Sequence, residues 1–124
     1  MRQYDFTPEE IKECGERILS AFSLARKAGK CVLGTNMCIE EIRKETAVIV
    51  AAANNLSANT VKKLSDSCSY HNVNLIFLDC DMLKLGQRLG KKGGASCAAI
   101  TDVGFAGIVD KIYAEIHTEL TEVQ

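Results

Sequence analysis

The sequence lacks the features by which several classes of protein are recognised. No apolar run among its 124 residues approaches the roughly 20 residues that a membrane-spanning helix needs. The first residues, MRQYDFTPEEIKE, contain neither the apolar core nor the cleavage signal of a secretory leader. There is no Walker loop and no Ser/His/Asp or Cys/His grouping. We therefore expect a cytoplasmic, non-catalytic protein that has no membrane association and no small-molecule substrate.

Metal-binding motifs are also missing, although the sequence contains six cysteines. None of them belongs to a Cys-x-x-Cys pair, and both histidines are remote from any cysteine cluster. Disulfides are not expected in a protein without a secretion signal. A thiol among apolar neighbours behaves as a small hydrophobic group. We therefore expect buried cysteines, no metal and no cofactor.

The net charge of −1 conceals an uneven distribution along the chain. Residues 17–92 carry twelve basic and six acidic groups, a net of +6, whereas residues 1–16 carry −3 and residues 93–124 carry −4. Local field rather than total charge decides whether a polyanion docks, so the middle of the chain is a candidate surface for nucleic acid. The alternative is that these lysines and arginines only solvate the outer faces of helices.

Strand-like and helix-like segments alternate along the chain. Helices are predicted over 7–28, 36–44, 57–70 and 81–89, the last interrupted by Gly86, and from Asp102 onward. Strands are predicted over 31–33, 46–53, 74–79 and 95–101, with 46–53 and 74–79 expected to be buried. This alternation favours one central sheet between helical layers. We expect a single domain over residues 1–124.

The first candidate site is Gly34-Thr35-Asn36, which follows a basic segment containing Lys27 and Lys30. Glycine allows close approach of the backbone to a ligand, and a helix N-terminus favours an anion such as phosphate. Asn36, the expected cap of the helix, offers a donor and an acceptor to a base edge, and Lys44 lies two turns further along. The alternative is an ordinary turn followed by an asparagine cap.

The second candidate site is the glycine-rich segment GKKGG over residues 90–94, between a predicted helix and a predicted strand. Glycines together with Lys91 and Lys92 predict a mobile, cationic loop that suits a shaped phosphate backbone. The alternative is a flexible connection whose lysines are merely solvated.

Several blocks, LARKAGKCVLGTN, VIVAAANN, SANTVKKLSDSCSYHNV, LG-x-x-x-GKK and AITDVGFA, give the sequence a specific resemblance to a known family. From about Phe22 to Ile112 it resembles the bacterial YlxQ-like branch of the L-seven-Ae family of ribosomal proteins, so residues 1–21 are mostly an N-terminal helical extension. The resemblance implies a three-layer α/β/α sandwich with a central mixed four-stranded sheet. It also implies recognition of structured kink-turn RNA, with ribosomal RNA and the ribosome as candidate partners.

The resemblance places specific residues at the RNA. Gly34, Thr35 and Asn36 fall on the family's recognition turn, and Lys44 on its phosphate-contacting base. The loop that meets an extruded nucleotide corresponds to Gly90 through Ser96, where the expected contacts are Lys91, Lys92, Gly93, Gly94, Ala95 and Ser96. Lys27 and Lys30 are expected to contact the RNA backbone from the segment before the turn. Met37 and Glu40 replace the glutamate and lysine usual in the family. They favour an alternative, a protein-interaction module on the same fold that has lost RNA binding and docks through its first helix.

Overall fold

The structure, a computed structural model, describes residues 4–123, with side chains from residue 4 to His117. Within this range the helices are α1 (Pro8–Lys27), α2 (Thr35–Arg43), α3 (Ala58–Tyr70), α4 (Met82–Leu89) and α5 (Val103–Val123). The strands are β1 (Cys31–Leu33), β2 (Ile49–Ala52), β3 (Asn74–Phe77) and β4 (Cys97–Ile100). Between residues 4 and 123 no helix has both the length and the apolar character needed to cross a membrane.

The four strands form one mixed sheet in the order β1-β4-β2-β3. Strand β4 is antiparallel to both of its neighbours, with Ala99 opposite Val32 on one side and opposite Val50 on the other. Strands β2 and β3 are parallel. The last strand in the sequence therefore lies beside the first, which brings the end of β1 next to the start of β4.

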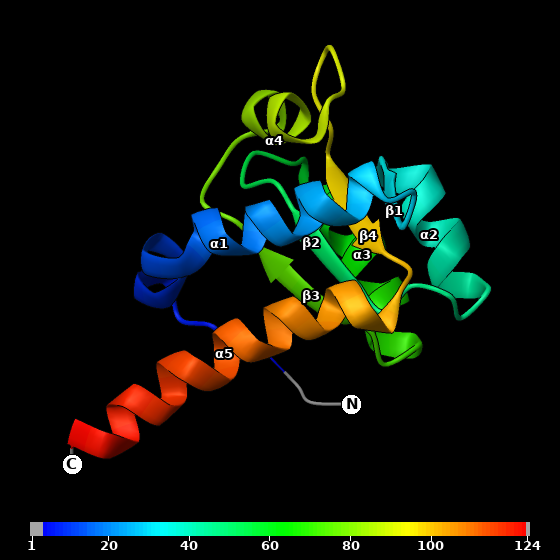
Figure 1. The fold of residues 1–124 in the computed structure, drawn as a ribbon. Helices are drawn as coiled ribbons and strands as arrows, with labels where there is room; N and C mark the ends of the chain where they lie inside the picture. The colour runs from blue at the N-terminus through cyan, green and yellow to red at the C-terminus, as the bar shows by residue number, and fades with distance from the viewer. Residues whose placement is uncertain (1–3, 124) are drawn as a thin grey trace.

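Helices cover both faces of the sheet (Figure 1). On one face α1 and α5 pack together over a core that includes Ile18, Phe22 and Val109. On the other face α2 and α3 enclose a second core that includes Ile42 and Leu64. The expected three-layer α/β/α sandwich with a mixed four-stranded sheet is confirmed.

The first helix is part of this sandwich. Thr7 caps α1, since its side chain accepts a hydrogen bond from the Glu10 N–H at 3.2 Å and its own N–H donates to Glu10 Oε1 at 2.8 Å. The apolar face of α1 is buried against the sheet and α5. A partner docking on this helix would therefore find only its outer, polar face.

Two details of the predicted elements need correction. The segment expected to be a buried strand is buried at Asn74, Ile76 and Leu78, but β3 lies at the edge of the sheet and Phe77 is 41% exposed there. Gly86 does not interrupt α4, which is continuous from Met82 to Leu89 and ends at Gly90 in a left-handed conformation. The expected burial of the thiols is confirmed, because all six cysteines are buried.

Candidate nucleic-acid interface

The turn after β1 is built around Gly34. Its φ of 95° and ψ of 155° lie in a region that L side chains rarely adopt, so glycine suits this position. The Gly34 N–H donates to the Cys97 carbonyl at 2.9 Å, and its own carbonyl accepts from the Cys38 N–H at 3.0 Å to begin α2. The turn is thus fixed to β4 on one side and to the helix on the other.

Gly34, and not Asn36, occupies the N-cap position of α2. Asn36 is the second residue of the helix, and no described side chain caps the helix by a hydrogen bond. The prediction of an asparagine cap is therefore wrong, because a glycine with positive φ already starts the helix. As a consequence, the exposed Asn36 side-chain amide does not cap the helix, and the backbone N–H groups before Cys38 have no partner within α2.

The loop between α4 and β4 is packed against α4 rather than loosely attached. The Lys91 N–H donates to the Gly86 carbonyl at 2.8 Å, and the Ala95 N–H donates to the Met82 carbonyl at 2.9 Å. A Cβ on Gly86 would lie 2.5 Å from the Cα of Gly94, so Gly86 admits the loop by having no side chain. This packing argues against the predicted mobility of the glycine-rich segment, although its cationic character stands.

The structure brings the turn and the loop together. The hydroxyls of Thr35 and Ser96 are 2.7 Å apart, in hydrogen-bond contact between α2 and the start of β4. The Nζ of Lys91 lies 3.8 Å from the position that a Cβ on Gly34 would occupy. Because β1 and β4 are paired antiparallel, these two segments are neighbours even though about 60 residues separate them in the sequence.

The other predicted basic contacts lie farther away. Lys30 is at the opposite end of β1, where its carbonyl accepts from the Thr101 N–H at 2.9 Å, and Lys27 ends α1. The three residues of β1 separate Lys30 from Gly34, so four steps along the strand place them roughly 13 Å apart. Lys44 follows the last residue of α2, and its Nζ lies 3.3 Å from Glu40 Oε1. These three lysines therefore surround the turn at a distance instead of lining it.

The lysines of the loop differ from the basic residues of the adjoining helix. Lys84 and Arg88 of α4 form ion pairs with Glu16 of α1, with 3.2 Å between Lys84 Nζ and Glu16 Oε1. The Arg88 and Lys84 hydrogen bonds lower the pKa of the Glu16 carboxyl. Lys91 and Lys92 are exposed, and neither forms an ion pair with any acid among residues 4–117. The loop thus presents unneutralised positive charge beside the turn.

A polar layer that the sequence did not reveal lies beneath the turn. Cys38 and Cys97 are fully buried under Thr35 and Ser96. The Cys38 thiol donates to the Val32 carbonyl at 3.8 Å, and the Ser96 hydroxyl donates to Cys97 Sγ at 3.6 Å. The neighbouring Cys97 thiol, together with burial, raises the pKa of Cys38. At Cys97 the Cys38 thiol, the Ser96 and Thr35 hydroxyls and the charge of Lys91 lower the pKa. Sequence reasoning treated both cysteines as apolar fillers, because their neighbours in the chain are apolar.

Exposed apolar side chains border the same region. Met37 on the first turn of α2 is 51% exposed, and Leu83 on the first turn of α4 is 57% exposed. Leu83 adjoins Met82, whose carbonyl holds Ala95 of the loop. Nothing in the sequence indicated that Leu83, on the first turn of a short helix, is exposed in this region.

These features define a class of protein: a small α/β/α sandwich whose distinctive surface is a glycine turn joined to a cationic loop. Within the described residues, no three His, Cys, Asp or Glu side chains come together in a way that would hold a metal ion. A family model described as the ribosomal protein L7Ae/L30e/S12e/Gadd45 family matches residues 16–110. The chain belongs to this family.

Individual relatives agree with the assignment. The chain is 37% identical over 83 residues to an RNA-binding protein YlxQ of Bacillus subtilis, covering 67% of this chain and 81% of the relative. It is 33% identical over 100 residues to the large ribosomal subunit protein eL8 of Haloquadratum walsbyi, covering 79% of this chain and 82% of that protein. The expected YlxQ-like branch and the non-enzymatic character of the family are confirmed.

The same architecture is found in solved structures. A 15.5 kDa RNA-binding protein of Giardia lamblia superimposes with a TM-score of 0.74 at 17% identity, covering 86% of this chain and 89% of the other. At this identity the likeness concerns the fold.

Proposed function

We propose that this chain is a cytoplasmic, non-catalytic protein that binds structured RNA of the kink-turn type and associates with the ribosome or another ribonucleoprotein. The observation that carries the proposal is the junction of the Gly34 turn with the 90–96 loop, through the 2.7 Å contact between the Thr35 and Ser96 hydroxyls. The relatives named as RNA-binding and ribosomal proteins support the same conclusion.

The chemistry of the junction fits a bent polyanion. The first N–H groups of α2 and the positive end of its dipole attract a phosphate or a base-edge acceptor. The Asn36 amide next to them supplies a donor and an acceptor for a base. Lys91 and Lys92 neutralise phosphates from the other side of the turn. The turn would therefore supply selectivity, and the loop affinity.

The more distant lysines suit a large ligand. Lys27, Lys30 and Lys44 stand around the turn at distances of one strand or one helix, so a single short phosphate run would not reach them all. A sharply bent RNA presents phosphates in several directions, which makes these residues outer backbone contacts. Gly93, Gly94 and Ala95 would contribute shape rather than charge. At Gly94 the lack of a side chain keeps the loop close to α4, since a Cβ there would lie 3.0 Å from the Met82 carbonyl oxygen.

The selectivity of the turn is tested by Asn36→Ala. We expect the preference for a kink-turn hairpin over a plain duplex to fall by about 1–3 kcal/mol, the size of a good specific base contact. Asn59→Ala is the matched control, because Asn59 is also exposed and also the second residue of its helix, α3. Titrations of both variants with both RNAs decide the matter; equal loss on hairpin and duplex would argue against a selective role.

The contribution of the loop is tested by Lys91→Ala. Removal of one phosphate contact should reduce the slope of log affinity against log salt by about one and weaken binding to all RNAs alike. Lys63→Ala on the exposed face of α3 is the control and should leave the slope unchanged.

The alternative is a protein-interaction module without RNA binding. Exposed Met37 favours it, as does Glu40, which places a carboxylate on the same helix and pairs with Lys44. Absence of uptake of kinked hairpins at low ionic strength, with a partner protein bound instead, would establish this alternative and end the RNA proposal.

A further inference from the structure

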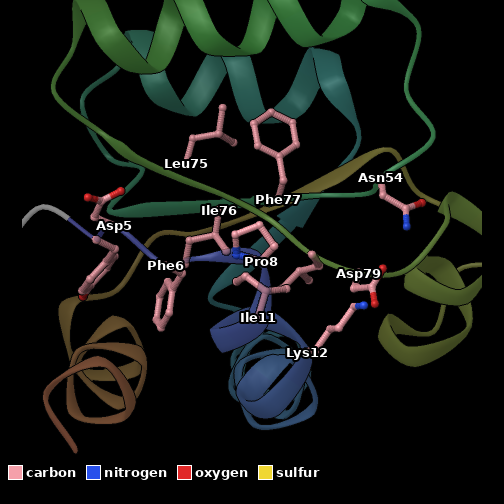
Figure 2. A pocket seen from close by; sticks show the side chains of 12 residues that line it. Asp5, Phe6, Pro8, Ile11, Lys12, Asn54, Leu75, Ile76, Phe77 and Asp79 are labelled. Carbon is pink, nitrogen blue, oxygen red and sulfur yellow. The ribbon is translucent and has the colours of Figure 1, made fainter. Parts of the chain in front are cut away.

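The open edge of the sheet carries a groove that the proposed RNA site does not use. The groove has a volume of about 410 Å³ and runs along β3 (Figure 2). Its apolar wall is formed by Phe6, Pro8, Ile11, Ile76 and Leu78. Figure 2 shows Ile76 pointing toward Phe6 and Pro8, while Leu75 and Phe77 point the opposite way, toward α3.

The main chain along this edge has unused hydrogen-bonding capacity. The Leu78 N–H donates to the Ala52 carbonyl at 2.9 Å, so Leu78 and the alternate residue Ile76 face β2. By the same alternation, the N–H and carbonyl groups of Leu75 and Phe77 face outward. Among the described residues, no hydrogen bond from another segment reaches these outward groups. A strand edge of this kind is a template for another strand.

The opposite edge is covered in part. At β1, Cys31 and Leu33 turn their main-chain groups outward, and the Cys31 carbonyl accepts a hydrogen bond from Arg26 Nη1 at 3.1 Å. Residues 73–78 of the β3 edge contain no charged residue and no proline, the usual protections against strand addition. Among the described residues, β3 is thus the longer edge strand and the one whose outward main-chain groups accept no side-chain hydrogen bond.

The two ends of the groove differ in charge. Asp5 lies at one end, exposed and without an ion pair among the described residues. Lys12 and Asp79, which carry opposite charges, both line the other end (Figure 2). A ligand with positive charge at one end only would match this pattern.

A second copy of the chain fits this edge poorly. Strand β3 has only four residues, and a two-fold pairing would set one concave groove against another and leave both unfilled. An extended peptide, in contrast, can pair with the outward groups and insert its alternate side chains between Phe6 and Ile76.

We propose that the β3 edge binds an extended peptide segment of a partner protein by strand addition. The segment has apolar residues at alternate positions and a basic residue at the end that lies next to Asp5. This surface is separate from the Gly34–Ser96 junction, which lies beyond β4 and β2 at the other side of the sheet.

The test uses three synthetic peptides: acetyl-KTVTVTV-amide, its charge control acetyl-QTVTVTV-amide, and a backbone control in which the middle valine of the first peptide is replaced by proline. Nitrogen-15-labelled full-length protein is titrated with each and followed by NMR. We expect the first peptide to shift the Leu75 and Phe77 amides saturably and to slow their hydrogen exchange. The backbone control should bind at least tenfold more weakly, a result that does not depend on any change in the protein.

Variants of the protein sharpen the test. Phe77→Pro removes an outward N–H without breaking the β2–β3 ladder, and it should reduce the affinity for the first peptide at least tenfold. Phe77→Thr keeps this N–H and should reduce the affinity less. Asp5→Asn should reduce affinity about threefold for the lysine peptide and leave the glutamine peptide unchanged. RNA titration of Phe77→Pro, expected to be unchanged, separates this proposal from the proposed function.

Several outcomes would overturn the proposal. They are shifts centred on the Gly34 turn, equal binding of the backbone control, no binding of any peptide at millimolar concentration, or a concentration-dependent dimer that Phe77→Pro abolishes. The last outcome would assign the edge to a second copy of the chain.

Discussion

The two edge strands of the sheet, β1 and β3, differ in how their outward main-chain groups are hydrogen-bonded. At the β1 edge, Arg26 covers the outward carbonyl of Cys31, and the strand leads directly into a turn fixed by hydrogen bonds to β4. At the β3 edge, no hydrogen bond from the described part of the chain reaches the outward groups of Leu75 and Phe77, and an apolar groove adjoins them. The β1 edge offers a preformed polar surface, whereas the β3 edge offers main-chain N–H and carbonyl groups that are able to pair with an added strand.

This difference matters for the kind of ligand that each edge suits. When hydrogen bonds to the neighbouring backbone hold a turn in place, its N–H groups and lysines are already positioned before the ligand arrives. Less ordering entropy then opposes binding. An open strand edge supplies affinity through main-chain hydrogen bonds, with selectivity left to the side-chain pockets. The first arrangement suits a shaped RNA and the second an extended peptide.

The largest expected effect comes from Gly86→Ala, which disrupts the packed loop on the β1 side of the sheet. The new Cβ would lie 2.5 Å from Gly94 Cα and 2.7 Å from the Lys91 carbonyl oxygen, both backbone atoms. Either α4 or the loop must move, at a cost of about 2–4 kcal/mol in unfolding free energy. RNA affinity should fall as well, because Lys91 leaves its place beside Gly34.

Gly107→Ala is the matched control for Gly86→Ala. Gly107 also lies inside a helix, α5, but a Cβ there meets nothing within 4 Å. Alanine should stabilise the protein by about 0.5–1 kcal/mol, because it lowers the entropy of the unfolded chain. Chemical denaturation measures both variants. If both changed stability by the same amount, the loop would not be fixed through Gly86.

Gly34→Ala should have the next largest effect. A φ of 95° with a ψ of 155° costs an L residue about 1–3 kcal/mol, so the turn must either store this strain or change shape. A reshaped turn would redirect the first N–H groups of α2 and weaken the binding of kink-turn RNA.

Gly29→Ala shows whether a loss of RNA binding reflects the turn or only lower stability. Gly29 also has a positive φ, 74°, but it lies at the end of α1, where a Cβ has open space. We expect a destabilisation of about 1 kcal/mol without a change in RNA affinity. RNA titrations and thermal melts of the two glycine variants, run in parallel, provide the comparison.

Much of the fold could be predicted because its signals are local. Thr7 and Glu10 mark the start of α1, Ser57 that of α3 and Asp81 that of α4, and the side chains of Thr7, Ser57 and Asp81 each cap their helix. The buried run over Ile49–Ala52 likewise has the composition of a central strand. Such features depend on neighbouring residues only.

The errors arise where distant parts of the chain meet. Gly86 looks like a helix breaker in the sequence, but its missing side chain accommodates Gly94. The apolar segment from Asn74 onward looks like an interior strand, and only the strand order places it at an edge. The contact of Thr35 with Ser96 depends on β4 inserting beside β1, which no spacing in the sequence indicates. The RNA-binding hypothesis requires these two segments to meet, and the fold joins them as expected; the hydroxyl contact that links them was not predicted.

The smallest expected effect concerns this joint itself. The Thr35 and Ser96 hydroxyls are half-buried and 2.7 Å apart, so a double-mutant cycle with Thr35→Val and Ser96→Ala should give a coupling of about 0.5–1.5 kcal/mol in unfolding free energy. If the contact also aligns the turn with the loop, each single variant should reduce the affinity for kink-turn RNA by a similar factor. The double variant should then reduce this affinity little further. Thr60→Val supplies the comparison, because Thr60 is in a hydroxyl contact with Ser57 at 3.0 Å on α3. That change should alter stability slightly and RNA affinity not at all. Additive losses in the cycle would mean that the turn and the loop hold the RNA independently, and the β1 side would then be no more preorganised than the open β3 edge.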